Sequence, residues 1–180
     1  AQYELSAAYY YGKGVPKDGA EAVKWMRKAA EQGNTSAQDD LGRMYANGDG
    51  VPKDYFEAVT WYRKAADQGN SSGQFHLAGM YHNGQGVPQD YSAAVKWLRK
   101  AAEQGDTDAQ YILGQSSTDG KRLFVSQNYK EAVKWYTMAA EQGYGKAQLG
   151  RGYLYEKGKG VFEDRIEAYK WYLLAGVNEP

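Results

Sequence analysis

The stretch that most resembles a reactive site is Gly69-Asn70-Ser71-Ser72-Gly73, which has the Gly-x-Ser-x-Gly spacing of a hydrolase nucleophile elbow. That elbow joins a strand to a helix and needs a histidine and an acid beside the serine. The apolar periodicity on both sides of this stretch indicates helices instead. We therefore interpret it as a turn between two helices and predict no catalytic residue.

The two histidines, His76 and His82, are the other residues that could do chemistry. They are six positions apart, which places them on different faces of one helix, so we predict surface roles and no shared metal ion. The chain has no cysteine and therefore no disulfide or thiolate ligand. Its Gly-x-Gly loops lack the third glycine of a dinucleotide fingerprint and the Lys-Ser/Thr of a phosphate loop, so no cofactor is predicted.

The overall charge argues against nucleic acid as a partner. The sequence holds 22 basic and 22 acidic residues, whereas DNA, RNA and anionic lipid all demand clustered basic charge. The longest apolar stretch, Trp171 to Val177, is far too short to cross a bilayer, so membrane insertion is not expected. The lack of cysteine is compatible with the bacterial periplasm, secretion and the cytoplasm alike, so no compartment is predicted.

All five tryptophans lie in one recurring motif, Glu/Ala-Ala-Val/Tyr-Lys/Thr-Trp. They are separated by 36, 36, 38 and 36 residues, and a fixed period of this size indicates a stacked repeat protein. We predict an all-α solenoid of antiparallel helix pairs that occupies residues 1–180 as a single domain. Its predicted repeats are 1–36, 37–72, 73–108, 109–146 and an incomplete 147–180.

Each repeat reads as a helical hairpin. In the first repeat the apolar residues of 1–12 share one sector of a helical wheel and predict an amphipathic helix, which we call helix A. The stretch from Gly12 to Pro16 ends it, because glycine tolerates a positive φ and proline restricts the residue before it. Asp18 and Glu21 then resemble a capping box that starts a second helix, helix B, which Gly33 stops.

Two repeats depart from this pattern. Repeat four has Ser117 where the others have tyrosine, and two extra residues before Val125. Its loop carries Lys121, Arg122 and Phe124 and is either a tolerated surface insertion or a contact site. Repeat five has Arg151 where leucine is expected, which suggests a terminal or truncated copy.

From Ala37 to Asp54 the sequence reads Ala-Gln-x-x-Leu-Gly-x-x-Tyr-x-x-Gly-x-Gly-Val-x-x-Asp, and Ala58, Trp61, Ala65, Ala66 and Gly69 follow. This pattern resembles the Sel-1-like repeat (SLR) family, a relative of the tetratricopeptide repeats, and the resemblance extends over all five copies. It implies a right-handed superhelix with the A helices on the concave face. It also implies an adaptor or scaffold that binds proteins or peptides.

We predict that a peptide-binding groove is lined by the third, seventh and tenth positions of each A helix, which differ freely between copies. Such a mixture of aromatic and hydrogen-bonding side chains is typical of recognition surfaces. The alternative is that an exposed face varies without function. The predicted groove residues are Tyr3, Tyr10, Asp39, Arg43, Phe75, His82, Tyr111, Gln115 and Tyr153.

Two other functions are weighed against binding. A cysteine-rich bacterial branch of the SLR family carries a penicillin-binding, β-lactamase-like label, but this chain has no cysteine and no Ser-x-x-Lys, so we expect no catalysis. A structural spacer within a larger protein is the other alternative. The tyrosine-rich first repeat, with Tyr3, Tyr9, Tyr10 and Tyr11, predicts either a fragment of a longer array or self-association through this end.

Overall fold

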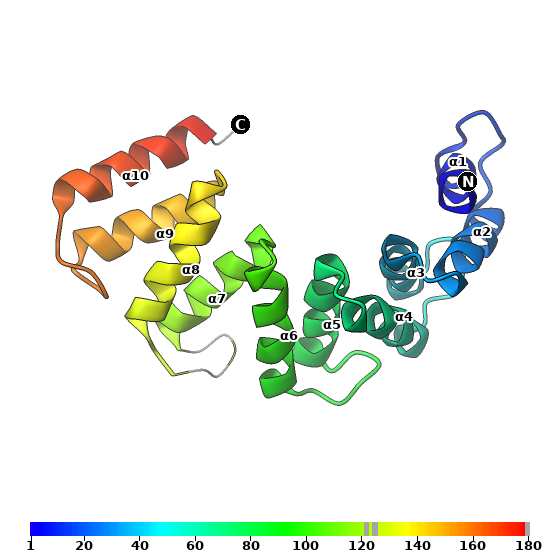
Figure 1. Cartoon of the computed structure of the whole chain (residues 1–180), viewed down its shortest axis with the longest axis horizontal. Helices are drawn as coiled ribbons and strands as arrows, with labels where there is room; N and C mark the ends of the chain where they lie inside the picture. Colours follow the sequence, from blue (N-terminus) through cyan, green and yellow to red (C-terminus); the bar gives the residue numbers. More distant parts are fainter. Residues whose placement is uncertain (121–122, 124–125, 179–180) are drawn as a thin grey trace. The chain divides into compact units, whose positions relative to one another are not determined.

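The computed structural model describes residues 1–120, 123 and 126–178, and within these ranges every regular element is an α-helix (Figure 1). The odd-numbered helices are the A helices and the even-numbered ones the B helices. The prediction of an all-α repeat solenoid is confirmed. The helices are α1 (Gln2–Tyr11), α2 (Gly19–Glu31), α3 (Thr35–Asn47), α4 (Tyr55–Asp67), α5 (Ser71–Asn83), α6 (Tyr91–Glu103), α7 (Thr107–Asp119), α8 (Tyr129–Glu141), α9 (Gly145–Glu156) and α10 (Arg165–Asn178).

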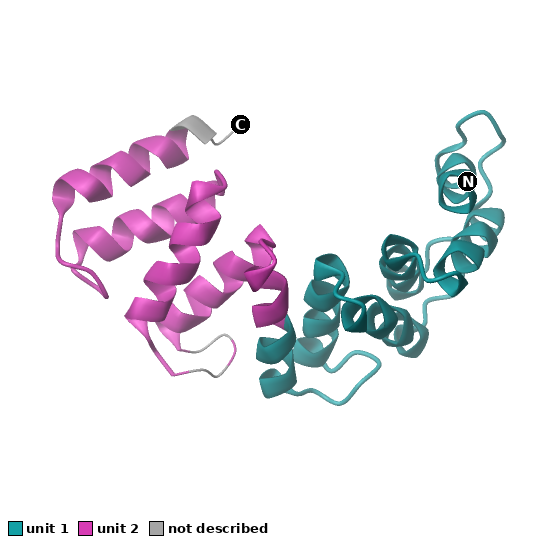
Figure 2. Ribbon diagram, viewed as in Figure 1, with its two compact units in different colours: residues 1–97 teal, residues 98–180 magenta. Residues whose placement is uncertain are grey.

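The chain forms two compact units, residues 1–97 and 98–180 (Figure 2). In the first unit α1 packs on α2 and α3 on α4, and α2 and α4 also contact the A helix that follows each of them. In the second unit α7 packs on α8 and α9 on α10, with α8 against α9. Each unit is therefore a stack of helical hairpins. A single domain over the whole chain stays a prediction.

The helix boundaries follow the predicted capping signals. The Asp18 carboxylate accepts hydrogen bonds from the backbone N–H groups of Ala20 and Glu21, at 2.9 and 3.0 Å, and so starts α2. The A helices α1, α3, α5 and α7 end at a glycine in the left-handed conformation, such as Gly48 with φ of 84°. Asn34, part of a formal glycosylation sequon, caps α3 by accepting from Ala37 N–H.

A buried glutamine fixes each turn between hairpins. Gln38 Nε2 donates to the Ala30 carbonyl at 3.0 Å, and the Gln38 side chain is almost fully buried. Because a buried amide without a partner is costly, this bond fixes how helix A leaves the preceding helix B. We call this contact the glutamine clamp. Gln74, Gln110 and Gln148 repeat it with Ala66, Ala102 and Ala140.

The tryptophans fill the core unevenly. Trp61 and Trp135 are 3% and 1% exposed, whereas the other three are half-buried. The Trp61 Nε1–H donates to Glu57 one turn earlier, at 3.2 Å, which satisfies the polar edge of a buried ring. Trp135 and Trp171 make the same bond to Glu131 and Glu167.

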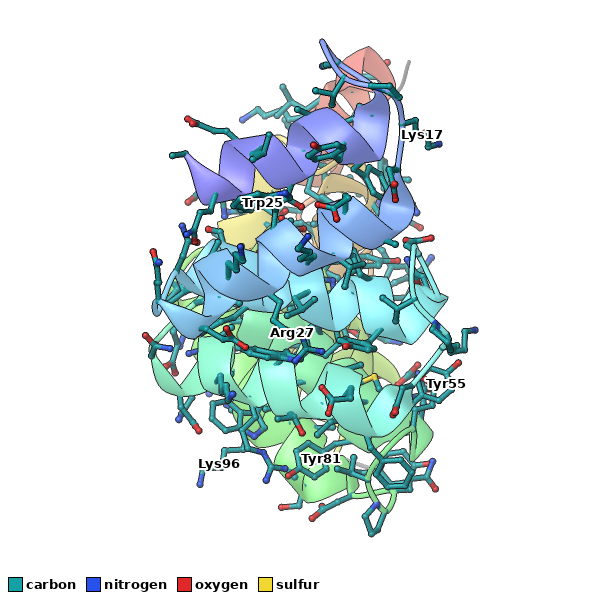
Figure 3. The ribbon with its side chains drawn as sticks, turned by 90° about the vertical axis from the view of Figure 1, so that its right-hand side faces the viewer. Lys17, Trp25, Arg27, Tyr55, Tyr81 and Lys96 are labelled. Atoms are coloured by element: carbon teal, nitrogen blue, oxygen red, sulfur yellow. The ribbon has the colours of Figure 1, made fainter. Side chains whose placement is uncertain are left out.

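An arginine near the end of helix B joins neighbouring hairpins in the first unit (Figure 3). Arg27 of α2 donates to the Tyr45 hydroxyl of α3, and its guanidinium lies 5.7 Å from the Tyr45 ring and 5.8 Å from the Trp61 ring. Arg63 of α4 repeats the hydrogen bond to Tyr81 of α5, at 2.5 Å. We call this arrangement the arginine junction.

Repeat four accommodates its insertion without losing the bond that closes the loop. The Asn128 N–H donates to the Ser117 carbonyl at 2.8 Å, as the Asp54 N–H does to Tyr45 at 2.9 Å. This bond uses the backbone, so replacing tyrosine by Ser117 leaves it intact. Leu123 of the loop is buried, whereas the predicted contact residues Lys121, Arg122 and Phe124 lie outside the described residues.

Candidate binding site on the A-helix face

Three of the predicted groove residues meet around one cavity of the first unit. Tyr3 and Tyr10 of α1 and Arg43 of α3 border a cavity of about 70 Å³. Its lining is aromatic and aliphatic except for one carboxylate, one guanidinium and the hydroxyl of Ser6. The full lining is Tyr3, Ser6, Ala7, Tyr10, Tyr11, Met26, Asp40, Arg43 and Met44.

Asp40 organises the polar side of this cavity. Its Oδ2 accepts from the Tyr3 hydroxyl at 2.5 Å, and its Oδ1 accepts from Arg43 Nη2 at 2.8 Å. The hydrogen bond to Asp40, followed by burial, raises the pKa of Tyr3 to about 12, because ionising the phenol would place two negative charges in contact. The same carboxylate raises the pKa of Arg43. Both side chains are therefore held in fixed orientations at neutral pH.

Asp39 is placed differently from the sequence-based expectation. It was predicted on an exposed face but is only 8% exposed, because α5 lies beside α3 and His76 of α5 covers it. The His76 Nδ1 lies 2.7 Å from Asp39 Oδ1. The His76 side chain is 33% exposed, so it lies partly at the surface and also joins two A helices through Asp39.

Tyr62 of α4 packs against the His76 ring that makes this contact. Its ring stacks on His76 with the centroids 5.0 Å apart, and Phe75 meets His76 edge-on at 5.7 Å. Gly42 makes room for Tyr62, since a Cβ at this position would lie 2.7 Å from the ring. Burial, together with the nearby Asp39 carboxylate, raises the pKa of Tyr62. Phe75 and Asp39 thus both contact His76, whose ring is stacked on Tyr62.

In the second unit the A-helix face near Tyr111 is mainly aromatic. The Tyr111 ring lies 6.0 Å from Tyr136 and 5.4 Å from Tyr144, and the Tyr144 hydroxyl donates to Asp108 at 2.7 Å. On α9, Leu149 is 41% exposed and Tyr153 is 38% exposed. Large apolar side chains at this exposure offer area for a partner to bury.

The remaining predicted residues occupy other surroundings. His82 packs edge-on against Tyr91 at the start of α6, with the ring centroids 5.4 Å apart. Gln115 is half-buried on α7. The Tyr153 hydroxyl accepts from Lys159 Nζ at 2.9 Å. Of these three, Tyr153 presents the largest apolar surface to solvent.

The sequence analysis missed Asp40, Tyr62 and Tyr144, which hold the predicted residues in place. Asp40 could have been found, because Asp40 and Arg43 are three residues apart on one helix and so lie on the same face. Tyr62 and Tyr144 give no such local signal, because the residues that they contact, His76 and Tyr111, belong to other helices.

The site offers hydrogen bonding and apolar contact. Within the described part of the chain, no three or more His, Asp or Glu side chains are grouped so that they could hold a metal ion. Over the same residues, no helix combines the length and the apolar character needed to span a membrane.

A family model described as "Sel1 repeat" matches residues 1–34, 35–70, 71–106, 107–144 and 145–176. Among solved structures, the chain is similar to a protective antigen of uropathogenic Escherichia coli with an SLR fold, at 38% identity and a TM-score of 0.94. The alignment covers 99% of this chain and 38% of the antigen, so the chain spans well under half of that protein.

The chain is also similar to a Sel1 repeat protein from Oxalobacter formigenes, at 37% identity and a TM-score of 0.89, over 99% of this chain and 73% of the other. The Helicobacter pylori cysteine-rich protein B is more distant, at 25% identity and a TM-score of 0.54, over 71% of this chain and 90% of the other. No curated protein matches the chain.

Proposed function

This chain belongs to the Sel1 repeat family, and we propose that it is a non-enzymatic module that binds a protein or peptide segment on the face formed by its A helices. Proteins of this family are generally interaction scaffolds. The observation that carries the proposal is that polar groups of the A-helix face are held in place by neighbours yet keep unused hydrogen-bonding capacity.

Arg43 is the clearest case in the first unit. One of its nitrogens is anchored to Asp40, its side chain is 44% exposed, and its other N–H groups have no hydrogen-bond partner among the described residues. A guanidinium has five N–H donors in a rigid plane, so an anchored one can bind a ligand with little further loss of conformational entropy.

Leu149 and Tyr153 support the proposal from the second unit. They are four residues apart on α9 and therefore on the same side of the helix. Their exposed apolar surface lies on an A helix, as does Tyr111 of α7. The Tyr111 ring packs against two neighbouring tyrosines. Rigid aromatic side chains are typical anchors of protein interfaces.

Alanine substitutions test this proposal. We expect Phe75→Ala with Tyr111→Ala to weaken binding about tenfold or more, because each removes an aromatic contact worth roughly 1–2 kcal/mol at an interface. The probe is a phage-displayed library of random 12-residue peptides selected on the unmodified chain, and affinities are measured by fluorescence polarisation.

The matched control is Phe56→Ala, which removes a phenylalanine that is 74% exposed on helix B. It should leave affinity unchanged. Unchanged affinity in the double variant, or failure to select any peptide, would contradict binding on this face. Thermal unfolding of all variants separates lost contacts from lost structure.

Incubation with a chromogenic β-lactam tests the absence of enzymatic activity. We expect no turnover above a heat-inactivated sample, because the sequence contains no Ser-x-x-Lys. Self-association through α1 also remains a prediction, and light scattering over a range of concentrations measures it. A structural spacer would be favoured if every substitution on the A-helix face were neutral for binding.

A further inference from the structure

The cavity between α1 and α3 has the size and lining of a pocket for one aliphatic side chain. A single water needs roughly 10–15 Å³ of such space, and this cavity offers about 70 Å³. Ala7, Met26 and Met44 give it an aliphatic lining, and methionine adapts its shape to what it contacts. The rings of Tyr3 and Tyr10 form part of the wall.

The polar groups at this cavity differ in how much of their hydrogen-bonding capacity is already used. Both oxygens of Asp40 already accept hydrogen bonds, one from Tyr3 and one from Arg43. The unused N–H groups of Arg43 and the Tyr10 hydroxyl have no hydrogen-bond partner among the described residues. The unused hydrogen-bond donors of the lining are thus the N–H groups of Arg43 and the Tyr10 hydroxyl.

The charges around the cavity favour the same kind of ligand. Lys13 Nζ lies 5.4 Å from the ring centroid of Tyr11, one of the residues that line the cavity. Asp39, next to Asp40 in sequence, is buried and paired with His76. Glu4 of α1 is exposed and is not among the residues that line the cavity. Among the residues that line the cavity, Arg43 is therefore the charged group with unused hydrogen-bond donors.

From these contacts we propose that this cavity is a subsite for a carboxylate-bearing peptide segment, in which an aliphatic side chain enters between Tyr3, Tyr10 and Met44 and an adjacent carboxylate pairs with Arg43. The pairing adds a charge-assisted hydrogen bond, which is stronger than a neutral one. This inference rests on the proposed function, since it names the chemistry of the segment that one part of the A-helix face binds.

The 12-residue peptides selected on the unmodified chain test the inference directly. We expect them to share a Val, Leu or Ile next to Asp or Glu. Arg43→Met keeps the aliphatic stem but removes the charge, and it should lower affinity about tenfold. Changing the peptide's Glu to Gln should lower affinity equally, and the two changes together should cost little more than either alone.

Two further arms identify the group that binds. Ala7→Trp should fill the cavity and abolish the preference for the aliphatic residue. Amidation of the peptide's C-terminus distinguishes a side-chain carboxylate, which predicts no effect, from the terminal carboxylate, which predicts a loss equal to that of Arg43→Met. Lys96→Met, which removes an exposed cation from helix B of repeat three, is the matched control and should change nothing.

Each outcome has a distinct meaning. Peptides that bind, respond to Tyr111→Ala and ignore both Arg43→Met and Ala7→Trp would overturn this inference and leave the proposed function standing. Selection of no peptide at all would overturn both. Circular dichroism of each variant confirms that it is folded, and if Ala7→Trp unfolds, the Arg43→Met cycle alone decides.

Discussion

The junction between repeats one and two and the junction between repeats four and five place a guanidinium beside the same two kinds of ring, but they take it from different helices. At the first junction Arg27 of helix B lies beside Tyr45 and Trp61 of the next repeat. At the later junction Arg151 of helix A lies 5.8 Å from the Tyr155 ring and 4.1 Å from the Trp171 ring.

Two departures in the sequence explain this exchange. The position of Arg27 is occupied in repeat four by Thr137, and the position of the buried Leu41 is occupied in repeat five by Arg151. One substitution removes the guanidinium from helix B, and the other supplies it from helix A. The comparison shows that the contact between guanidinium and rings is retained while the residue that supplies the guanidinium changes.

The two arrangements differ in what they connect. Arg27 donates a hydrogen bond across the junction, to Tyr45. Arg151 instead packs within its own repeat, and its one ion pair across the junction, to Glu141, is 3.8 Å long with a carboxylate that is 64% exposed. Such exposed pairs contribute little. Arg151 Nε and Nη1 are also buried without hydrogen-bond partners among the described residues.

The largest effect should come from the rings themselves. We expect Trp61→Ala to cost about 3–5 kcal/mol, the usual range for removing a buried aromatic side chain, because Trp61 is 3% exposed. Trp171→Ala should cost clearly less, since that ring is half-buried. Urea unfolding followed by circular dichroism measures both, and equal losses would contradict the difference drawn between the two junctions.

An exchange of residues at the later junction should have an intermediate effect. Thr137→Arg alone places a second guanidinium beside Arg151, and we expect it to destabilise by about 0.5–1 kcal/mol through like-charge repulsion. Adding Arg151→Leu recreates the arrangement of the first junction and should restore or exceed the original stability.

The coupling energy of this double-mutant cycle should be about 1–2 kcal/mol in favour of the pair. The reciprocal cycle, Arg27→Thr with Leu41→Arg, is the control at the first junction. If the effects of the two single substitutions simply added at both junctions, the two arginine positions would not be coupled, and the proposed exchange of the guanidinium would be wrong.

The smallest effect should come from the acid beside the indole. Glu57→Gln keeps an acceptor for Trp61 Nε1–H but removes its charge, and we expect a loss of about 0.5 kcal/mol, because a charge-assisted hydrogen bond is stronger than a neutral one. At Glu21 the same change should have almost no effect, because Glu21 pairs with exposed Lys24 instead of Trp25. Matched urea titrations compare the free energies of unfolding of the two variants. An equal loss would mean that Glu21 also accepts a hydrogen bond from the Trp25 indole in solution.

Much of the fold could be predicted from the sequence, because its signals are local and repeated. The spacing of the tryptophans gave the helical hairpins, and Asp18 and Gly12 marked ends that the structure confirms. Each of these signals depends on residues within one or two helical turns. Signals of this kind can be recognised without knowing which helices pack against each other.

The candidate site could be predicted only in part, because its details depend on which helices lie side by side. Asp39 and His76 are 37 residues apart and meet only when α3 and α5 are stacked. From the sequence alone, the substitution at Arg151 suggests a terminal or truncated copy of the repeat. Its contact with Trp171 becomes visible only when both helices are placed.

The glutamine clamp has a consequence for how such chains can change in length. In each clamp the Gln side chain of one hairpin donates to a backbone carbonyl near the end of the preceding hairpin. The same residue type and the same kind of bond therefore link adjacent repeats at all four turns. In the sequence, the two extra residues of repeat four fall between Gly120 and Val125, far along the chain from any clamp. We therefore expect that whole hairpins can be exchanged or duplicated at these turns, because the same bond forms there whatever variable surface residues a hairpin carries.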